Sequence, residues 1–159
     1  MTICGLDNAG KTTIVNYLMT GEFTETEPTM GANRETLDLP KLQLGIIDLG
    51  GQEDFRGMWS EVNEKTNSFV YVVDSTDQQR LDETKEIFHN IVNTQLNENV
   101  PTLILLHKVD LENRITRADF VEHFELASLK FKWRCFETSA KTGYGIYPSF
   151  KWLVNELGG

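Results

Sequence analysis

A stretch near the start of the chain has the composition and spacing of a phosphate-binding loop. Residues 5–12 read Gly-Leu-Asp-Asn-Ala-Gly-Lys-Thr and fit the pattern G-x-x-x-x-G-K-[ST]. Gly5 and Gly10 allow backbone angles closed to other residues, so successive N–H groups can curl around phosphate oxygens. Lys11 would reach the β- and γ-phosphates of a nucleotide, and the Thr12 hydroxyl would bind Mg²⁺. The residues expected to surround the phosphates are Asp7, Asn8, Ala9, Gly10, Lys11, Thr12 and Thr13.

The residues on either side of this loop predict a strand before it and a helix after it. Residues 2–4 are typical of a strand end, and residues 13–19 carry Ile14, Val15 and Leu18 at helical spacing. A helix N-terminus favours an anion through its dipole and its free N–H groups. Four fixed positions could match by chance, but this strand–loop–helix context argues against an accidental glycine turn.

Strands and helices are predicted in alternation along the rest of the chain. The further predicted strands cover residues 34–39, 42–48, 69–73, 102–106 and 133–137. Predicted helices follow Ser75 as an N-cap, follow Thr116, and cover residues 146–157. Such alternation is typical of a doubly wound α/β fold of the P-loop NTPase type. We expect a mostly parallel six-stranded sheet with one antiparallel hairpin strand, helices on both faces, and a single domain over residues 1–159.

Composition excludes several classes of protein. The chain has 159 residues and a formal net charge of −9, which argues against nucleic acid as a partner. We find no apolar run long enough to span a membrane, no signal peptide and no lipidation site, so we expect no membrane anchor within this chain and a cytoplasmic location. Cys4 and Cys135 match no metal spacing and are predicted to be buried free thiols.

Polar residues follow the predicted strands. Sheets of this class bind ligands at the carboxyl ends of their strands, where such residues meet. A P-loop needs an acidic residue at a nearby strand end to hold Mg²⁺, and Asp48 and Asp74 are both candidates. Asp48 is favoured because Gly51 would let the backbone approach a γ-phosphate and Gln52 could orient a water for in-line attack. The polar positions at predicted strand ends are Gly5, Asp48, Asp74, Asp110 and Ser139.

Several segments taken together resemble the nucleotide-binding motifs of small GTPases. They are residues 5–12, Pro28-Thr29, residues 48–52, Lys108-Val109-Asp110 and Thr138-Ser139-Ala140-Lys141. The Leu-Asp version of the P-loop and the Gly-Gly-Gln triplet resemble the Arf and Arf-like branch, and the resemblance runs through essentially the whole chain. It implies a molecular switch that binds GTP or GDP with Mg²⁺, slowly hydrolyses GTP, and acts in trafficking or another membrane-associated process.

The resemblance also implies a role for each matching residue. Thr29 would complete the Mg²⁺ shell and sense the γ-phosphate, Asp48 would hold Mg²⁺ through water, and Gln52 would position the hydrolytic water. Lys11, Thr29 and Gln52 are therefore the expected catalytic residues, and Thr12, Thr29 and Asp48 the expected metal site. Gly51 would lie against the γ-phosphate.

The resemblance further implies how the base is recognised. Asp110 would accept hydrogen bonds from guanine N1 and N2, whereas adenine would leave this carboxylate unpaired. The Ala140 backbone N–H would meet guanine O6. Lys108 and Lys141 would lay their aliphatic stems over the base and ribose. The expected base-side residues are His107, Lys108, Asp110, Ser139, Ala140 and Lys141.

His107 and the short N-terminus depart from the family pattern. His107 stands where the family motif has Asn, and we expect weaker nucleotide affinity or altered bracing of the P-loop, or else a histidine satisfied within the strand end. The family's N-terminal amphipathic helix is expected to be absent, because only a few residues precede the P-loop. Association with membranes would then be peripheral, through partners or through a missing N-terminal segment.

Partners and alternative functions complete the predictions. We expect a monomer that works with an exchange factor, a GTPase-activating protein and effectors, whose identities remain open. One alternative is a guanine-nucleotide-binding scaffold with little or no hydrolysis, which His107 and the short N-terminus favour slightly. Another is a P-loop kinase of a small metabolite, which would need a basic lid over the phosphates; the sequence offers no arginine cluster for one.

Overall fold

The computed structural model describes residues 2–6, 9–20, 33–39, 42–48, 67–94, 99–130 and 132–157. The predicted alternation of strands and helices is confirmed within these ranges. The strands are β1 (Thr2–Cys4), β2 (Asn33–Leu39), β3 (Leu42–Asp48), β4 (Phe69–Asp74), β5 (Thr102–His107) and β6 (Trp133–Thr138). The helices are α1 (Lys11–Thr20), α3 (Leu81–Thr94), α4 (Arg117–His123) and α5 (Ile146–Glu156), with 3₁₀ turns at Gln78–Arg80 and Leu126–Ser128.

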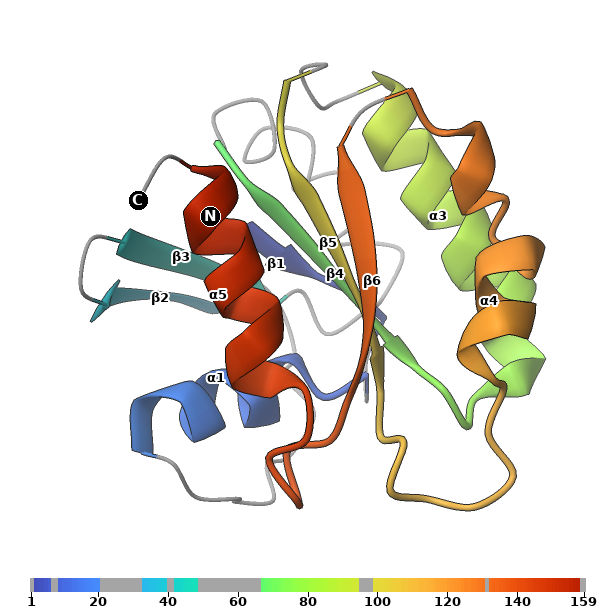
Figure 1. Cartoon of the computed structure of the whole chain (residues 1–159), viewed down its shortest axis with the longest axis horizontal. Helices are drawn as coiled ribbons and strands as arrows, with labels where there is room; N and C mark the ends of the chain where they lie inside the picture. Colours follow the sequence, from blue (N-terminus) through green and yellow to red (C-terminus); the bar gives the residue numbers. More distant parts are fainter. Residues whose placement is uncertain are drawn as a thin grey trace.

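The strands form two sheets instead of the single six-stranded sheet that we predicted. Four parallel strands pair in the order β1-β4-β5-β6, while β2 and β3 form a separate antiparallel hairpin. The hairpin lies beside β1 (Figure 1). The prediction of a parallel sheet and an antiparallel hairpin is therefore right, but their fusion into one sheet is wrong for the described strands. β1 offers only three residues, all paired with β4, so it provides little length for a second ladder.

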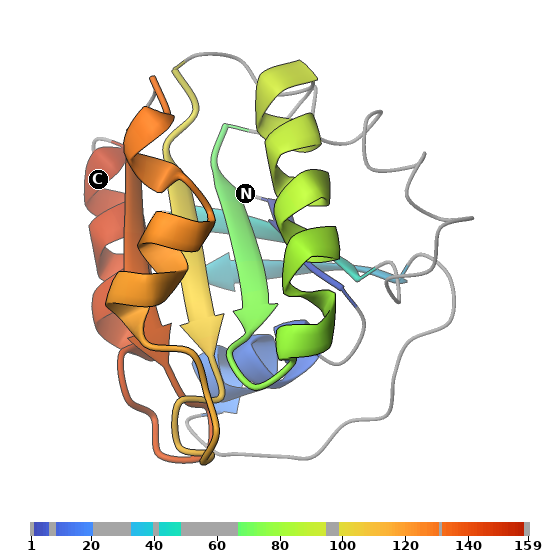
Figure 2. The same ribbon diagram turned by 90° about the vertical axis from the view of Figure 1, so that its right-hand side faces the viewer.

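The helices cover the parallel sheet in two layers. α3 and α4 lie on one face and α1 and α5 on the other (Figures 1 and 2). Side chains of β4 alternate between the two sides. Phe69, Tyr71 and Val73 belong to the core cluster under α3 and α4, whereas Val70 and Val72 belong to the cluster under α1 and α5. Burial on both faces explains why β4 and β5 are continuous apolar runs.

Of the two predicted helix N-caps, one is present in the structure and the other is not. Thr116 caps α4 as predicted, since its side chain accepts a hydrogen bond from the Asp119 N–H at 3.2 Å. The prediction that Ser75 caps a helix is wrong: α3 begins at Leu81 after a 3₁₀ turn, and the buried Ser75 hydroxyl has no hydrogen-bond partner in the described structure. Its backbone is instead held by β5, because the Ser75 N–H donates to the His107 carbonyl at 3.0 Å.

Two further predictions concern the cysteines and the absence of a membrane-spanning segment. Cys4 and Cys135 are buried and form no disulfide bond, as predicted. None of the described helices combines the length and apolar character that crossing a membrane requires.

Candidate nucleotide-binding site

Parallel pairing brings the carboxyl ends of the strands to one edge of the sheet. The register aligns Asp74 with His107 and His107 with Thr138. The loops that follow β1, β4, β5 and β6 therefore gather at the edge where α1 begins (Figure 1). This is the edge at which doubly wound sheets bind ligands.

Lys11 forms hydrogen bonds with the backbone of the phosphate-binding loop. The Lys11 ammonium donates hydrogen bonds to the carbonyl oxygens of Gly5 and Leu6, each at 2.8 Å, and the residue is 3 % exposed. Gly10 has φ +102°, an angle that favours glycine. α1 then starts at Lys11, and Thr12 lies half-buried in its first turn. The loop thus presents a lysine and a helix N-terminus at one place.

His107 links this loop to the end of β6. Its imidazole Nδ1 shares a hydrogen bond with Thr138 Oγ1 at 2.8 Å, and the residue is 2 % exposed. A Cβ on Gly10 would lie 2.5 Å from His107 Cδ2, so the ring packs directly against the P-loop glycine. Burial and the neighbouring Lys108 charge lower the pKa of His107 to about 4. The ring is therefore neutral at physiological pH, a satisfied histidine that also contacts the P-loop.

The loop after β5 meets the loop after β6. The Ser139 hydroxyl donates to Asp110 Oδ1 at 2.7 Å, and the Val109 N–H donates to the Thr138 carbonyl at 3.2 Å. Ala140 is buried beside them, whereas Lys141 is exposed. A hydroxyl that holds one carboxylate oxygen fixes the direction in which the other can accept hydrogen bonds.

The comparisons with known proteins decide which family has this arrangement. The model of the ADP-ribosylation factor family matches residues 1–157. The chain belongs to this Arf family. ADP-ribosylation factor F from Dictyostelium discoideum is 40% identical over 158 residues, covering 98% of this chain and 83% of the relative. ADP-ribosylation factor 1 from Brassica rapa subsp. pekinensis is 38% identical over 156 residues, covering 98% and 86%.

A solved structure agrees with the family assignment. The Arl6 BBS3 small GTPase from Trypanosoma brucei, with bound nucleotide analogue GppNp, superimposes with a TM-score of 0.86 at 29% identity, covering 99% of this chain and 95% of that one. The predicted resemblance to small GTPases of the Arf and Arf-like branch is therefore confirmed. This Arf-family chain is a GTP-binding switch protein and a GTPase.

Asp74, one of the two aspartates considered for Mg²⁺, has partners that the sequence did not reveal. Lys108 has φ +65° and its Nζ lies 3.0 Å from Asp74 Oδ2, while Thr76 donates to Asp74 Oδ1 from its N–H and its hydroxyl. Burial raises the pKa of Asp74, but the hydrogen bonds from Thr76 and Lys108 outweigh it and leave the pKa below its ordinary value. Asp74 thus holds Lys108, which leaves Asp48 as the aspartate considered for Mg²⁺.

The structure covers only part of the predicted site. It brings together Gly10, Lys11, Thr12, Thr13, His107, Lys108, Asp110, Ser139 and Ala140, with Lys141 next in the chain and Ala9 buried within the P-loop. Asp48 is the last residue of β3. Asp7, Asn8, Thr29, Gly51 and Gln52 lie outside the described residues, so their roles stay predictions.

Two supporting residues were missed because their partners are distant in sequence. Thr138 entered the prediction only as part of a motif, yet it anchors His107. Tyr17 of α1 packs its hydroxyl against Gly143, which has φ +82° in the loop before α5. No local pattern marks Tyr17, since it lies on a helix face with ordinary core residues.

Proposed function

We propose that this Arf-family protein, as one domain over residues 1–159, works as a Mg²⁺-dependent guanine-nucleotide switch that cycles between GTP and GDP. One observation carries the proposal: Asp110 is held by Ser139 at the sheet edge where the P-loop meets His107. That pairing supplies an oriented acceptor for a base within one site that also has a lysine and a helix N-terminus for phosphates.

The base would be selected by hydrogen-bond complementarity. Asp110 would accept from the N1–H and N2–H groups of guanine, and the Ala140 N–H would donate to O6. Adenine has an acceptor at N1, so it would leave the carboxylate unpaired and would be rejected strongly. Lys108, held by Asp74, and Lys141 would cover the base and ribose with their aliphatic stems.

The phosphates would be bound by the loop N–H groups and by Lys11. The Lys11 ammonium would exchange the carbonyls of Gly5 and Leu6 for the β- and γ-phosphate oxygens, a change that a flexible side chain can make. Mg²⁺ prefers oxygen ligands and keeps several waters, which fits the Thr12 hydroxyl, Thr29 and a water-mediated contact to Asp48. When bound, Mg²⁺ would neutralise charge that develops on the phosphates.

Hydrolysis would then follow from positioning and charge stabilisation. A water oriented by Gln52 attacks the γ-phosphorus, and the bond from that phosphorus to the β–γ bridging oxygen breaks to give GDP and phosphate. Lys11 and the P-loop N–H groups stabilise the charge that accumulates on the departing β-phosphate side. The sequence offers no internal arginine for this task, so an activating protein would accelerate the reaction.

The switch would act through partners. GTP would order the segments around Thr29 and Gly51, and hydrolysis would release them, so that effectors distinguish the two states. An exchange factor would restore GTP. We propose that the protein acts in trafficking, as is typical of its family, and is associated with membranes only peripherally.

Two measurements test the proposal against the scaffold alternative. The first is chromatography of the nucleotide that heat denaturation releases from the purified protein. The second is single-turnover GTP hydrolysis by the wild type, by Gln52→Leu and by the control Gln79→Leu, which alters an exposed glutamine outside the site. Released GDP and a hydrolysis rate lost only in Gln52→Leu support the switch. Retained GTP with equal slow rates favours the scaffold, and released adenine nucleotide overturns the base assignment.

A further inference from the structure

β6 forms a free edge of the parallel sheet. It pairs with β5 alone among the described strands. The Lys132 carbonyl accepts from the Thr102 N–H at 2.9 Å, so Lys132 directs its backbone toward β5. In a parallel ladder every second residue faces the same neighbour, and the residues between them face the other way. The residues whose backbone N–H and C=O groups are directed away from β5 are Trp133, Cys135 and Glu137.

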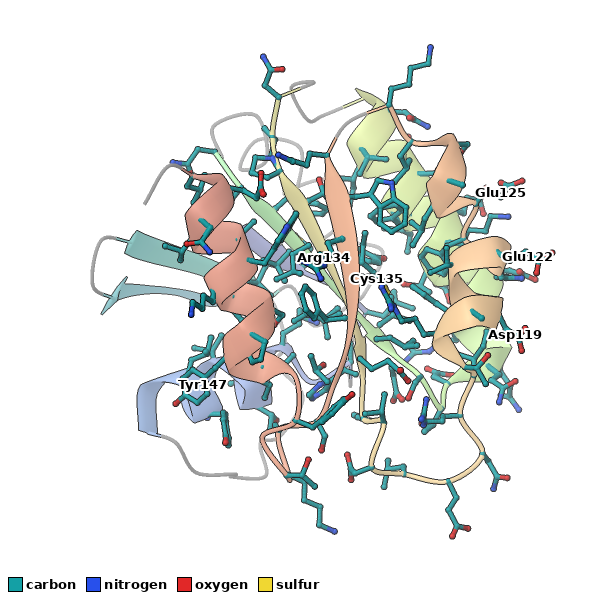
Figure 3. All side chains as sticks on the ribbon, in the orientation of Figure 1. Asp119, Glu122, Glu125, Arg134, Cys135 and Tyr147 are labelled. Atoms are coloured by element: carbon teal, nitrogen blue, oxygen red, sulfur yellow. The ribbon has the colours of Figure 1, made fainter. Side chains whose placement is uncertain are left out.

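A cavity of about 400 Å³ opens at this edge, between β6 and the first residues of α4 and α5. β6 lies between these two helices in Figure 1, and Arg134 and Cys135 extend to its opposite sides in Figure 3. We call this space the β6-edge cavity. Its lining includes Arg117, Arg134, Cys135, Glu137, Tyr144 and Pro148.

The two arginines of the β6-edge cavity have no carboxylate partner within the described structure. The Arg134 guanidinium lies 4.8 Å from the centre of the Phe136 ring, and Arg117 lies near Cys135, where its charge acts to lower the pKa of the thiol. Burial raises the pKa of Cys135 to about 12, so the thiol is neutral and leaves the Arg117 charge uncompensated. Elsewhere, carboxylates pair with Arg80, Lys85, Lys108, Arg114 and Lys132.

The nearby acidic residues do not neutralise these arginines. Glu137 lines the cavity, but its carboxylate is bound by Arg114 at 2.7 Å. Asp119, Glu122 and Glu125 are exposed on or just after α4 and point away from β6 (Figure 3). Arg134 therefore packs on a neutral ring and Arg117 lies beside a neutral thiol, so both charges stay available to an incoming anion.

We propose that the β6-edge cavity binds an acidic segment of a partner protein. A guanidinium presents a planar fork that matches a carboxylate with two hydrogen bonds. The backbone of β6 adds little to such a contact, because Cys135 is 1 % exposed and the Glu137 carbonyl packs against Gly145. Tyr144 is 62% exposed at the rim, and tyrosine and arginine are the residues that most often dominate binding energy.

The overall charge of the protein adds to this argument. A net charge of −9 repels an acidic segment from most of the surface, so attraction has to come from a local concentration of unpaired positive charge. The β6-edge cavity supplies it next to the base loop, because the carbonyl of its lining residue Tyr144 accepts from the Ser139 N–H at 2.9 Å. Binding is therefore tested with the nucleotide in place.

The test is a titration of the full chain, purified with its bound nucleotide. The probe is a fluorescent synthetic peptide that alternates glutamate and valine, followed by anisotropy at low salt; the control peptide has glutamine in place of glutamate. We expect Arg134→Gln and Arg117→Gln each to weaken binding of the acidic peptide roughly tenfold or more. Lys151→Gln removes the same charge from an exposed residue outside the cavity and is expected to leave binding unchanged.

Several outcomes would overturn the proposal. Equal binding by the wild type and Arg134→Gln, or no preference for glutamate over glutamine, would remove the role of the arginines. Arginine-dependent binding of inorganic phosphate without peptide binding would make the cavity a small-anion site. A dimer in sedimentation that Arg134→Gln dissociates would assign it to a second copy. Arg134 is exposed, so this variant tests the idea even if Arg117→Gln unfolds, and nucleotide content measured in each sample separates this result from the proposed function.

Discussion

Among the single residues of the site, His107 is tightly packed. Its ring fills the space against Gly10 and pairs with the Thr138 hydroxyl. His107→Ala would leave a void and an unpaired buried hydroxyl, and we expect the free energy of unfolding to fall by about 2–4 kcal/mol. Urea unfolding would measure this, and GDP dissociation should become faster in the same variant. His107→Asn restores a polar group at the position and should be affected less; equal losses in both variants would contradict the packing argument.

The buried imidazole also predicts a pH dependence of stability. The pKa of His107 is about 4 in the folded protein and ordinarily 6.5, so between these values the unfolded state binds more protons at this residue. Stability should therefore decrease as the pH falls from 6.5 toward 4, by up to about 1.4 kcal/mol per pH unit from this residue. Unfolding of the wild type and His107→Asn at several pH values isolates the contribution, because the carboxylates titrate in both. Parallel curves would show that His107 does not cause the dependence.

Conservative substitutions of Asp110 and Ser139 test the proposed base site. Asp110→Asn should lower GDP affinity by roughly a hundredfold or more, because an amide opposite guanine N1 leaves donors facing each other. Ser139→Ala keeps the carboxylate but loses the hydrogen bond that orients it, so we expect roughly a tenfold loss. Fluorescent-GDP titration gives both values, and Ser128→Ala, a change at an exposed serine in the turn after α4, serves as the control. A larger effect for Ser139→Ala than for Asp110→Asn would contradict the assigned roles.

At the scale of elements, the first turn of α4 is fixed by its cap. Thr116→Ala removes the acceptor for the Asp119 N–H and should cost about 1 kcal/mol, whereas Thr116→Ser keeps the hydroxyl and should cost little. Thermal unfolding would measure both variants. GDP affinity should stay unchanged, because α4 packs beside β6 and its cap takes no part in the site. A nucleotide defect in Thr116→Ala would show that α4 positions the base loop.

Some of the elements could be predicted from the sequence alone, and others could not. Local patterns were enough for β4 and β5, which are buried on both faces, and for the Thr116 cap, since these depend on neighbouring residues. The assignments that failed or were missed depend on distant contacts. Ser75 is held by the His107 carbonyl instead of capping a helix, and Tyr17 contacts Gly143 across the fold.

The site was predictable to a similar extent. The P-loop and base-loop motifs identified the chemistry because phosphate and guanine each demand particular groups at particular spacing. Spacing could not show that Lys108 pairs with Asp74, because that contact joins the ends of two strands that only the sheet brings together. It also could not show that a histidine in place of Asn packs against Gly10, since the fit depends on the position of the ring.

At the scale of the whole molecule, the site is continuous with the core. Ala9 of the P-loop and Ala140 of the base loop belong to the same buried cluster as Ile14, Val72 and Phe150, beneath α1 and α5. A ligand that holds both loops therefore holds two separate parts of this cluster together. Binding to the folded state alone raises stability by mass action, with no change in the core itself.

This continuity predicts a large thermal effect of the nucleotide. GDP with Mg²⁺ at about a thousand times its dissociation constant should add about 4 kcal/mol to the free energy of unfolding. For a domain of this size that corresponds to a rise in Tm of roughly 10 °C. Differential scanning fluorimetry of nucleotide-stripped protein would measure it, with ATP and Mg²⁺ as the control ligand and Asp110→Asn as the control variant. Chelation of Mg²⁺ should remove part of the shift, because the phosphates would lose the positive charge that Thr12 and Asp48 are proposed to hold beside them. An equal shift with ATP would contradict guanine selection by Asp110, and no shift with GDP would mean that the two loops do not bind one ligand.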